Sequence, residues 1–262
     1  MHVRGLMNMQ YAIKDNVVYV LEANPRASRT VPLVSKVCNI QMVPLATEIL
    51  ISQLTGAPSP VPALKEKKIP YFGVKEAVFP FNMFQEVDPV LGPEMRSTGE
   101  VLGLSSDSGE AYYKAQEATQ TKLPMGGKVL ISVNDFDKPD IARIGQTFYD
   151  FGFEILATSG THQVFNACGI PSKVVKKQFE GRPNVKDLIL NGDVNLIVNS
   201  HRGKDDIHDD SYLRKAAIKA KIPYCTTLAA AQAAARGLLH VKTHEDGQVK
   251  SIQELHKEIK DL

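Results

Sequence analysis

The residue types and spacings best suited to chemistry lie near the start of the chain. Glu22 and Asn24 are two positions apart at the end of an alternating apolar stretch, so their side chains leave the same face of an extended chain. Pro25 stops regular pairing, and Arg26 and Arg29 follow in a turn. Carboxylate and carboxamide oxygens beside two guanidinium groups suit a divalent cation bridged to phosphate oxygens. The alternative is a strand end with a solvated acid and two surface arginines.

An expected β-hairpin favours the cation site. Two alternating segments flank Lys-Asp-Asn at 14–16, which is typical of a turn. Folding the chain there places Gln10 opposite or nearly opposite Glu22, on a face shared with Asn24. The two segments are residues 6–13 and 17–22.

A second group of polar residues follows strand-like segments in the C-terminal half. The run Thr-Ser-Gly-Thr at 158–161 opens a helix-like segment, so its amides and hydroxyls could hold a phosphate at a positive helix terminus. Ligands of parallel sheets bind beyond the carboxyl ends of the strands, so side chains from several strand ends are expected to converge. The alternative is a set of ordinary polar loops with a helix cap at Thr158. The candidate residues are Lys138, Thr158, Thr161, Lys177, Asn199 and His201.

The elements that must position this second group begin near residue 128. An apolar run at 128–133 is typical of a strand buried on both faces, and further strand-like runs alternate with helix-like ones. This order predicts a doubly wound, mostly parallel α/β domain of about five strands. Glycines and a proline at 123–127 predict a hinge, which divides the chain into domains at 1–122 and 128–262. The other expected strands are 153–157, 194–198 and 222–225, and the expected helices are 139–151, 209–221, 227–236 and a last one containing residues 252–259.

The N-terminal part is expected to be mainly helical after the hairpin. A helix starts at Thr30, and an apolar helix at 42–54 ends at Gly56. Because the second helix lacks a polar face, we expect it to be buried or to form a partner surface. Asp107 and Glu110 have the spacing of a capping box at the start of a third helix.

Composition restricts the class of protein. The chain has 262 residues, 43% hydrophobic residues and a formal net charge of +2, as expected of a globular protein with one or two domains. The balanced charge argues against nucleic acid or membrane as a partner, and no apolar run reaches the length of a membrane span. Three cysteines without a Cys-x-x-Cys spacing, and no signal peptide, predict a cytoplasmic location. His240 and His244 lack partners for a metal site and are interpreted as surface residues.

Two runs of sequence carry a resemblance to a known family. The segments MNMQ at 7–10 and EANPRASRTVPLVSK at 22–36 resemble the end of the second ATP-grasp module of the carbamoyl phosphate synthetase large subunit. The run DPVLGPEMRSTGEV at 88–101 is similar to a run found in that subunit specifically. The similarity continues to the C-terminus and implies the C-terminal portion of a large subunit. The implied fold is an incomplete ATP-grasp segment with hairpin and helices, followed by the α/β domain.

The resemblance implies a role for each residue of the first group. Gln10, Glu22 and Asn24 would bind Mg²⁺ or Mn²⁺ at an ATP site, and Arg26 and Arg29 would contact phosphate groups as catalytic residues. Phosphoryl transfer depends on positioning and on charge neutralisation, which metal ions and arginines supply. The lysines, glycine-rich loop and adenine pocket of such a module would lie upstream. The chain is therefore expected to start inside a domain and to make no carbamoyl phosphate alone.

The α/β half looks like the methylglyoxal-synthase-like regulatory domain of the same subunit, which binds nucleotide monophosphates. The residues that would hold the phosphate of uridylate or inosinate are Lys138, Thr158, Thr161 and Lys177, and those nearer the ribose or base are Asn199 and His201. By the same resemblance, Glu76, Leu91 and Thr226 would bind the activator ornithine. Two positions depart from the family: His201 replaces a small hydroxyl residue, and Cys225 replaces the acid of some bacterial members.

Three functions stay open at this point. The resemblance implies an ATP-dependent ligase of arginine and pyrimidine synthesis that works with a glutaminase small subunit and is able to oligomerise. A free methylglyoxal synthase, which is a lyase, would need an aspartate in a glycine-rich loop. The loop after Val198 is NSHRGKDD and lacks the paired glycines of that motif. A docking module would bind no nucleotide.

Overall fold

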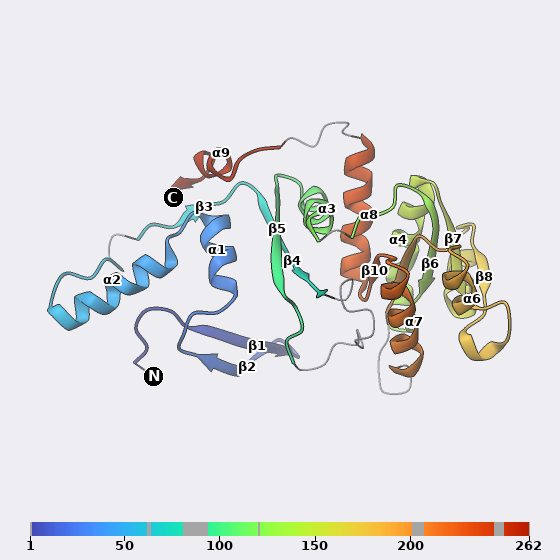
Figure 1. The fold of residues 1–262 in the computed structure, drawn as a ribbon, viewed down its shortest axis with the longest axis horizontal. Helices are drawn as coiled ribbons and strands as arrows, with labels where there is room; N and C mark the ends of the chain where they lie inside the picture. The colour runs from blue at the N-terminus through green and yellow to red at the C-terminus, as the bar shows by residue number, and fades with distance from the viewer. Residues whose placement is uncertain are drawn as a thin grey trace. The chain divides into compact units, whose positions relative to one another are not determined.

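The computed structural model describes residues 2–61, 64–80, 94–119, 121–200, 207–243 and 249–261. It forms two compact units. The smaller unit joins the two ends of the chain, Met1–Phe72 and Gln248–Leu262, and the larger unit is Gly73–Gly247 (Figure 1). The smaller unit is therefore discontinuous in sequence.

The predicted hairpin is confirmed in the smaller unit. Strand β1 (Asn8–Lys14) pairs antiparallel with β2 (Val17–Asn24). The two turn residues between the strands, Asp15 and Asn16, both have positive φ values, 49° and 61°. Asparagine and aspartate adopt this conformation more readily than other side chains do, and it matches the twist of a two-residue hairpin.

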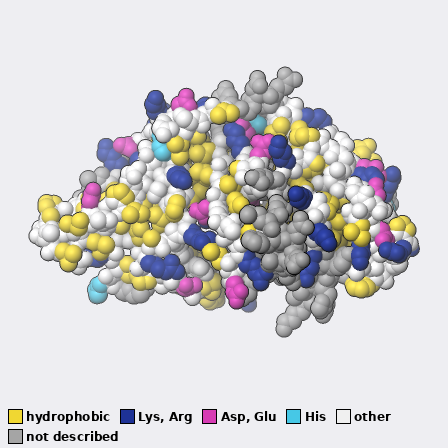
Figure 2. Space-filling model, in the orientation of Figure 1, with side chains coloured by type: hydrophobic (Ala, Val, Ile, Leu, Met, Phe, Trp, Pro, Cys, Tyr) yellow, Lys and Arg dark blue, Asp and Glu magenta, His cyan; other side chains and the backbone are white. Residues whose placement is uncertain are grey.

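Two helices follow the hairpin. Helix α1 (Thr30–Cys38) and helix α2 (Met42–Thr55) are as predicted, and Gly56 ends α2 with a φ of 73°. Only Ala46 and Ser52 of α2 are buried, and hydrophobic surface gathers over this helix (Figure 2). Its exposed large apolar side chains are Val43, Leu50, Ile51 and Leu54. In the part of the chain that the structure describes, no single helix is long and apolar enough to cross a membrane; α1 and α2, bent by 105° at their junction, meet that criterion only as a pair.

Three donors from distant segments cap the C-terminal end of α1. The carbonyls of a last helical turn lack intrahelical partners, and a helix C-terminus favours positive charge. The pairs are Tyr71 Oη to the Val37 carbonyl at 2.7 Å, Lys67 Nζ to the Asn39 carbonyl at 2.9 Å and His256 Nε2 to the Lys36 carbonyl at 2.6 Å. A carbonyl oxygen can only accept, so Nε2 of His256 carries its proton.

The last residues of the chain belong to this smaller unit. His256 lies in helix α9 (Ile252–Lys257), and strand β11 (Lys260–Asp261) pairs antiparallel with β3 (Lys67–Lys68). The compact units therefore differ from the predicted domains, since residues 248–262 do not belong to the unit that contains the α/β sheet. The reason is long-range pairing, which the local pattern of the last helix does not reveal.

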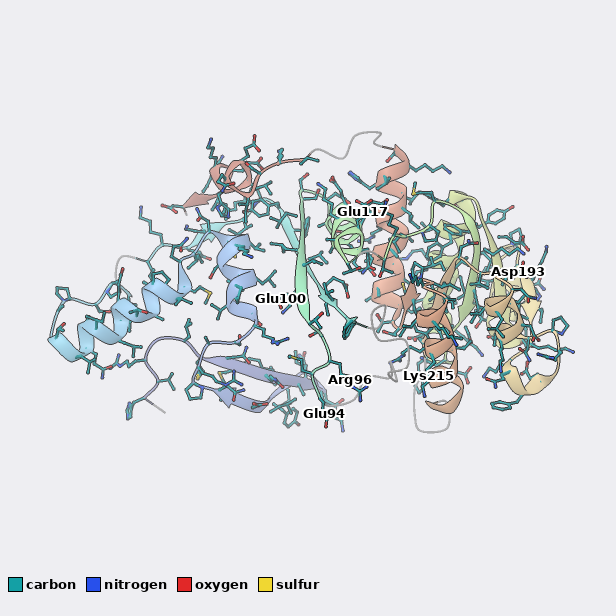
Figure 3. All side chains as sticks on the ribbon, in the orientation of Figure 1. Glu94, Arg96, Glu100, Glu117, Asp193 and Lys215 are labelled. Carbon is teal, nitrogen blue, oxygen red and sulfur yellow. The ribbon has the colours of Figure 1, made fainter. Side chains whose placement is uncertain are left out.

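The larger unit begins with a two-stranded sheet and one helix. Strand β4 (Phe72–Val78) pairs with β5 (Gly99–Ser105), and helix α3 (Ser108–Ala118) follows. An ion pair of 2.7 Å joins Lys75 to Glu100 across the two strands. Figure 3 shows Glu94, Arg96 and Glu100 along the segment that enters β5, and Glu117 on α3.

Glycines bring α3 very close to its neighbours. A Cβ on Gly103 of β5 would lie 2.0 Å from the Ala111 carbonyl oxygen, and a Cβ on Gly109 would lie 2.8 Å from the backbone of Gly237. Gly237 belongs to helix α8 (Leu228–Thr243), so α3 packs against both β5 and α8. Because of this packing, the predicted hinge at 123–127 lies inside the larger unit.

The predicted doubly wound parallel sheet is confirmed. Five parallel strands have the order β10-β9-β6-β7-β8, so the first strand of the domain is central and the order reverses beside it. Helices α4 (Lys138–Phe151), α5 (Ser159–Ala167), α6 (Val185–Leu190) and α7 (Ile207–Lys219) lie between the strands in sequence. The strands are β6 (Gly127–Ser132), β7 (Phe153–Thr158), β8 (Lys173–Val175), β9 (Leu196–Asn199) and β10 (Tyr224–Cys225).

Both faces of this sheet are covered (Figure 1). Val129 and Ile131 of β6 pack into a core formed with α4, α5 and α8, whereas Leu130 between them packs into a second core with α6 and α7. All three residues are 0% exposed. Alternate side chains of a strand point to opposite faces, so an uninterrupted apolar strand requires helices on both sides.

A buried carboxylate joins α3 to α8. The Glu110 side chain accepts hydrogen bonds from Ser105 Oγ and from Lys114 Nζ, the latter at 2.8 Å, and lies 3.2 Å from Nε2 of His240. The expected capping box is therefore only half formed: Asp107 caps the Glu110 amide at 2.9 Å, but the Glu110 side chain turns toward α8. The interpretation of His240 as a surface residue is wrong, because only 19% of its side chain is exposed.

The setting of Glu110 predicts acid sensitivity. Burial raises the pKa of Glu110, but hydrogen bonds from Lys114 and Ser105 and the nearby charges outweigh it and hold the pKa below its usual value of 4.5. A carboxyl with a lowered pKa stabilises the fold above its usual pKa, and the contribution is lost as pH falls through the folded value. Glu110→Gln should therefore be less stable than wild type at neutral pH and lose less stability on acidification.

Urea denaturation at about pH 7 and about pH 4 measures this difference. Glu154→Gln is the control, since Glu154 forms an exposed pair with Lys173 at 2.8 Å, and exposed pairs contribute little. Equal acid sensitivity of Glu110→Gln and wild type would contradict the role of this carboxylate.

Candidate functional site

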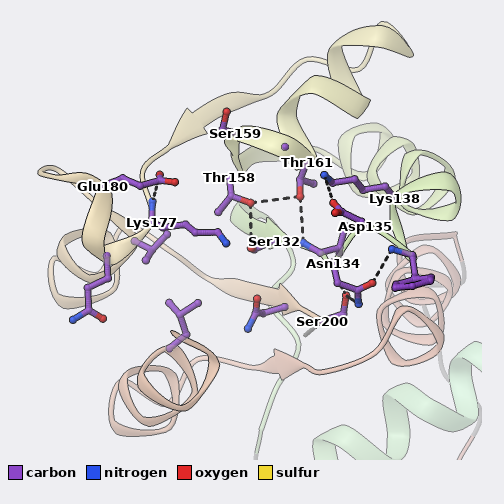
Figure 4. Close-up of a pocket in the computed structure, with 17 residues that line it drawn as sticks. Ser132, Asn134, Asp135, Lys138, Thr158, Ser159, Thr161, Lys177, Glu180 and Ser200 are labelled. Carbon is purple, nitrogen blue, oxygen red and sulfur yellow. Dashed lines mark hydrogen bonds and ion pairs between the residues drawn. The ribbon is translucent and has the colours of Figure 1, made fainter. Parts of the chain in front are cut away.

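A pocket of about 440 Å³ lies at the carboxyl ends of the strands in the larger unit (Figure 4). Its size is that of ordinary ligand pockets. Strands β6, β7 and β9 and the segment after β8 each contribute polar side chains, as the topology of a doubly wound sheet requires. The residues named from sequence that line it are Lys138, Thr158, Thr161, Lys177 and Asn199, and the sixth, His201, lies outside the described residues.

Buried hydroxyl groups line part of the pocket and hydrogen-bond to one another or to the backbone. Thr158 Oγ1 donates to Ser132 Oγ at 3.1 Å, and Thr161 Oγ1 accepts from the Val133 amide at 3.2 Å. Thr158 and Thr161 are 5% and 1% exposed. The hydroxyls fasten the start of α5 to the end of β6, and Thr158 makes no side-chain cap to α5. The first amides of α5 thus keep their capacity to bind an anion.

Two lysines supply positive charge here: Lys138 lies at the start of α5, and Lys177 lines the pocket. A Cβ on Gly160 would lie 2.8 Å from Lys138 Nζ, so this ammonium group sits against the first turn of α5. Lys138 also pairs with Asp135 at 2.5 Å, and this exposed partner has its pKa lowered mainly by the hydrogen bond from Lys138. The Lys177 side chain extends into the pocket toward Thr158 (Figure 4). Hydroxyls, amides and ammonium groups at one place form a good phosphate site.

Asn134 orders the loop between β6 and α4. Its Oδ1 accepts from the Phe136 amide at 2.9 Å, and its Nδ2 donates to Ser200 Oγ at 3.1 Å and to Asp137 Oδ2 at 2.8 Å. The loop that carries Lys138 is therefore tied to the end of β9. Sequence reasoning missed Asn134, although an asparagine directly after a buried strand is a typical turn former.

Several other pocket residues were also missed. Val185 and Leu213 are buried, 2% and 7% exposed, and give the pocket an apolar side. Val185 begins α6 and Leu213 lies on α7, and their apolar character gave no functional signal. The remaining missed residues are Ser132, Val133, Asp135, Phe136, Gln178 and Glu180. Ser159, Gly160 and Ser200 also line the pocket and lie within the runs named from the sequence.

The hairpin of the smaller unit brings the first group together. The register pairs Gln10 with Glu22, and Asn24 Nδ2 donates to Glu22 Oε1 at 2.5 Å. The Asn24 carboxamide oxygen and the second carboxylate oxygen of Glu22 remain for a cation, and an all-oxygen set with Gln10 fits Mg²⁺ or Mn²⁺. Among the described residues no cluster of three His, Cys, Asp or Glu side chains could hold a metal, so this set depends on its two amides.

The structure gives less support for a functional role of the two arginines after the hairpin. Arg26 is exposed, and its Nη1 donates to the Ala27 carbonyl at 3.2 Å. Arg29 is the N-terminal flanking residue of α1 and is also exposed. Their roles as catalytic residues stay a prediction, as do the metal roles of Gln10, Glu22 and Asn24.

The residues proposed for ornithine are partly described. Glu76 on β4 accepts from Gln116 Nε2 at 3.0 Å. Burial raises the pKa of Glu76, and hydrogen bonds from the Ala77 backbone and Gln116 oppose it only in part. Thr226 is exposed after β10, and Leu91 lies outside the described residues. The ornithine assignment stays a prediction.

Comparison with known proteins gives the family. A family profile described as "MGS-like domain" matches residues 140–226. The chain is 49% identical to the carbamoyl phosphate synthase large chain of Gemmatimonas aurantiaca over 255 aligned residues. The aligned residues make up 97% of this chain and 23% of that protein. It is 43% identical to the carbamoyl phosphate synthase large chain, C-terminal section, of Aquifex aeolicus, over 98% of this chain and 51% of that one.

A third relative agrees with these two. The corresponding C-terminal section from Methanocaldococcus jannaschii is 46% identical over 99% of this chain and 43% of that protein. The chain thus spans between 23% and 51% of the length of these three relatives. The similarity along nearly the whole chain, with the MGS-like domain on the parallel sheet, confirms the resemblance found in the sequence: the chain belongs to the carbamoyl phosphate synthase large-chain family and corresponds to its C-terminal section.

Proposed function

We propose that the pocket of the larger unit binds a nucleoside monophosphate as a regulatory ligand. The observation that carries this proposal is the position of Lys138 and Lys177 beside the uncapped start of α5. The phosphate would lie against α5, with the ribose and base toward Asn199 and the apolar side of the pocket. Uridylate and inosinate are the expected effectors.

The chain would act within a carbamoyl phosphate synthase large chain, an ATP-dependent ligase. The whole enzyme would make carbamoyl phosphate in the cytoplasm from bicarbonate and ammonia, for arginine and pyrimidine synthesis, with a glutaminase small subunit that supplies the ammonia. Gln10, Glu22 and Asn24 would hold Mg²⁺ or Mn²⁺, which neutralises phosphate charge when bound. Arg26 and Arg29 would orient phosphate oxygens, and Glu76, Leu91 and Thr226 would bind ornithine.

Calorimetric titration of the chain with uridylate and with inosinate tests the regulatory role. Saturable binding of either nucleotide is expected, and binding of neither would contradict it. We expect no carbamoyl phosphate from the chain with ATP, bicarbonate and ammonia. Methylglyoxal formed from dihydroxyacetone phosphate would instead support a lyase, but the family comparison gives that alternative no support.

A further inference from the structure

Two acids line the pocket together with its two lysines. The acids are Asp135 and Glu180, and the lysines are Lys138 and Lys177. The formal charges of these four side chains therefore cancel, although a phosphate is bound best by an excess of positive charge. Each carboxylate must either stabilise the local fold or oppose an anionic ligand.

Glu180 stabilises the local fold. Its Oε2 accepts a hydrogen bond from the backbone amide of Lys177 at 2.8 Å, at the start of the short 3-10 helix Gln178–Glu180 (Figure 4). The carboxylate thus satisfies a backbone donor, as the acid of a capping box does. The position of Glu180 beside the pocket follows from the structure of this segment.

Asp135 is bonded instead to a side chain that is expected to hold the phosphate. Its Oδ1 lies 2.5 Å from Lys138 Nζ, and in the part of the chain that the structure describes its side chain has no other ion pair or hydrogen bond (Figure 4). The pKa of Asp135 is lowered by the hydrogen bond and the charge of Lys138, and the charge of Lys177 adds to the shift. The carboxylate therefore lies in the field of both lysines.

The backbone at Asp135 is fixed, whereas its side chain is free to turn. Asn134 accepts from the Phe136 amide at 2.9 Å and donates to Ser200 Oγ at 3.1 Å, so the loop is held on both sides of Asp135. The Asp135 side chain is 87% exposed, and an exposed ion pair contributes little to stability. A ligand can therefore replace this carboxylate without rearranging the loop.

We propose that Asp135 is a counter-ion that competes with the phosphate for Lys138 and so lowers the affinity of the pocket for nucleoside monophosphates. The inference rests on the proposed nucleotide site and deepens it. When the phosphate binds, its oxygens replace the Asp135 carboxylate or share the ammonium group with it. In both cases the competition weakens binding. The lower affinity keeps the site responsive, since a regulatory ligand must dissociate when its concentration falls.

Calorimetric titration of Asp135→Asn with uridylate and with inosinate tests the competition. Asparagine keeps the shape of the side chain and an oxygen that can accept from Lys138, so the main change is the loss of charge. We expect about two- to fivefold tighter binding than in the wild type, the factor that corresponds to an exposed ion pair of ordinary strength. The affinity of the variant should also fall more steeply with added salt, because its pocket is more positive.

Glu154→Gln is the matched control. Glu154 also belongs to an ion pair with a lysine, at 2.8 Å from Lys173, but neither residue lines the pocket. This variant loses the same formal charge as Asp135→Asn and should bind the nucleotides as the wild type does. An equal gain in both variants would attribute the effect to the net charge of the protein and would overturn the competition.

The other outcomes separate the competition from the function on which it rests. Unchanged or weaker binding by Asp135→Asn would overturn the competition and leave the nucleotide site standing; weaker binding would show that Asp135 positions Lys138 for the phosphate. Failure of both the wild type and Asp135→Asn to bind either nucleotide would overturn the nucleotide site as well. Binding by the variant alone would support the competition, because the carboxylate would then exclude the phosphate from the wild-type pocket.

Discussion

Replacing Gly103 by alanine is expected to lower the free energy of unfolding of the larger unit by about 3 kcal/mol, the upper end of ordinary overpacking costs. The added Cβ would lie 2.0 Å from the Ala111 oxygen and 2.6 Å from the Ala115 nitrogen. Both are backbone atoms of α3 and cannot rotate away as a side chain would. The strand or the helix would have to move, and α3 is held on its other side by α8.

Gly99 in the same strand supplies a matched control. A Cβ there meets nothing within 4 Å. Gly99→Ala should leave stability unchanged or raise it slightly, because alanine loses less backbone entropy on folding than glycine. Urea denaturation followed by circular dichroism compares the two variants. Similar midpoints would show that β5 does not approach α3 as closely as described.

Replacing Lys138 by methionine is expected to weaken nucleotide monophosphate binding by about ten- to a hundredfold, the loss expected for one charge-assisted hydrogen bond of about 1.5–3 kcal/mol. The ammonium group lies against the first turn of α5, where a phosphate would bind. Methionine keeps the length of the apolar part of the side chain and removes the ammonium group. The fold should therefore be retained, and calorimetry measures the change in affinity.

Lys173→Met separates a local contact from a general effect of charge. Lys173 is exposed and pairs with Glu154 instead of lining the pocket. The two variants lose the same formal charge, so only a specific contact makes Lys138→Met the weaker binder. Equal losses of nucleotide affinity in both variants would show that binding depends on the overall electrostatic field of the protein, which added salt screens.

Local chemistry was sufficient to predict the hairpin and most of the sheet. Asp15 and Asn16 define the turn, and the register that follows from it pairs Tyr11 with Val20. A register shift between Gln10 and Tyr11, which the sequence pattern does not reveal, then places Gln10 opposite Glu22. Strand β8 was missed because it has only three residues, Lys173–Val175, too few for a periodic pattern. Its neighbour Lys177 was nevertheless found, since its charge and its place between elements do not depend on that strand.

Long-range packing accounts for the other differences. The membership of α9 in the smaller unit depends on a bond from His256 to the Lys36 carbonyl, more than two hundred residues earlier in the chain. The side chain of Glu110 leaves the expected capping box because α8 brings His240 beside it. Neither partner is visible in the local sequence. The pocket was easier to predict, because the topology of parallel strands forces their carboxyl ends together.

The discontinuous smaller unit has a consequence for synthesis on the ribosome. Domains usually fold as they emerge, the N-terminal one first. Here β3 and the end of α1 must wait for residues made much later, because β3 pairs with β11 and the Lys36 carbonyl bonds to His256. Gly73–Gly247 is complete before β11 and His256 are made. The larger unit can therefore fold before the smaller one, although the smaller unit contains the residues that are translated before it.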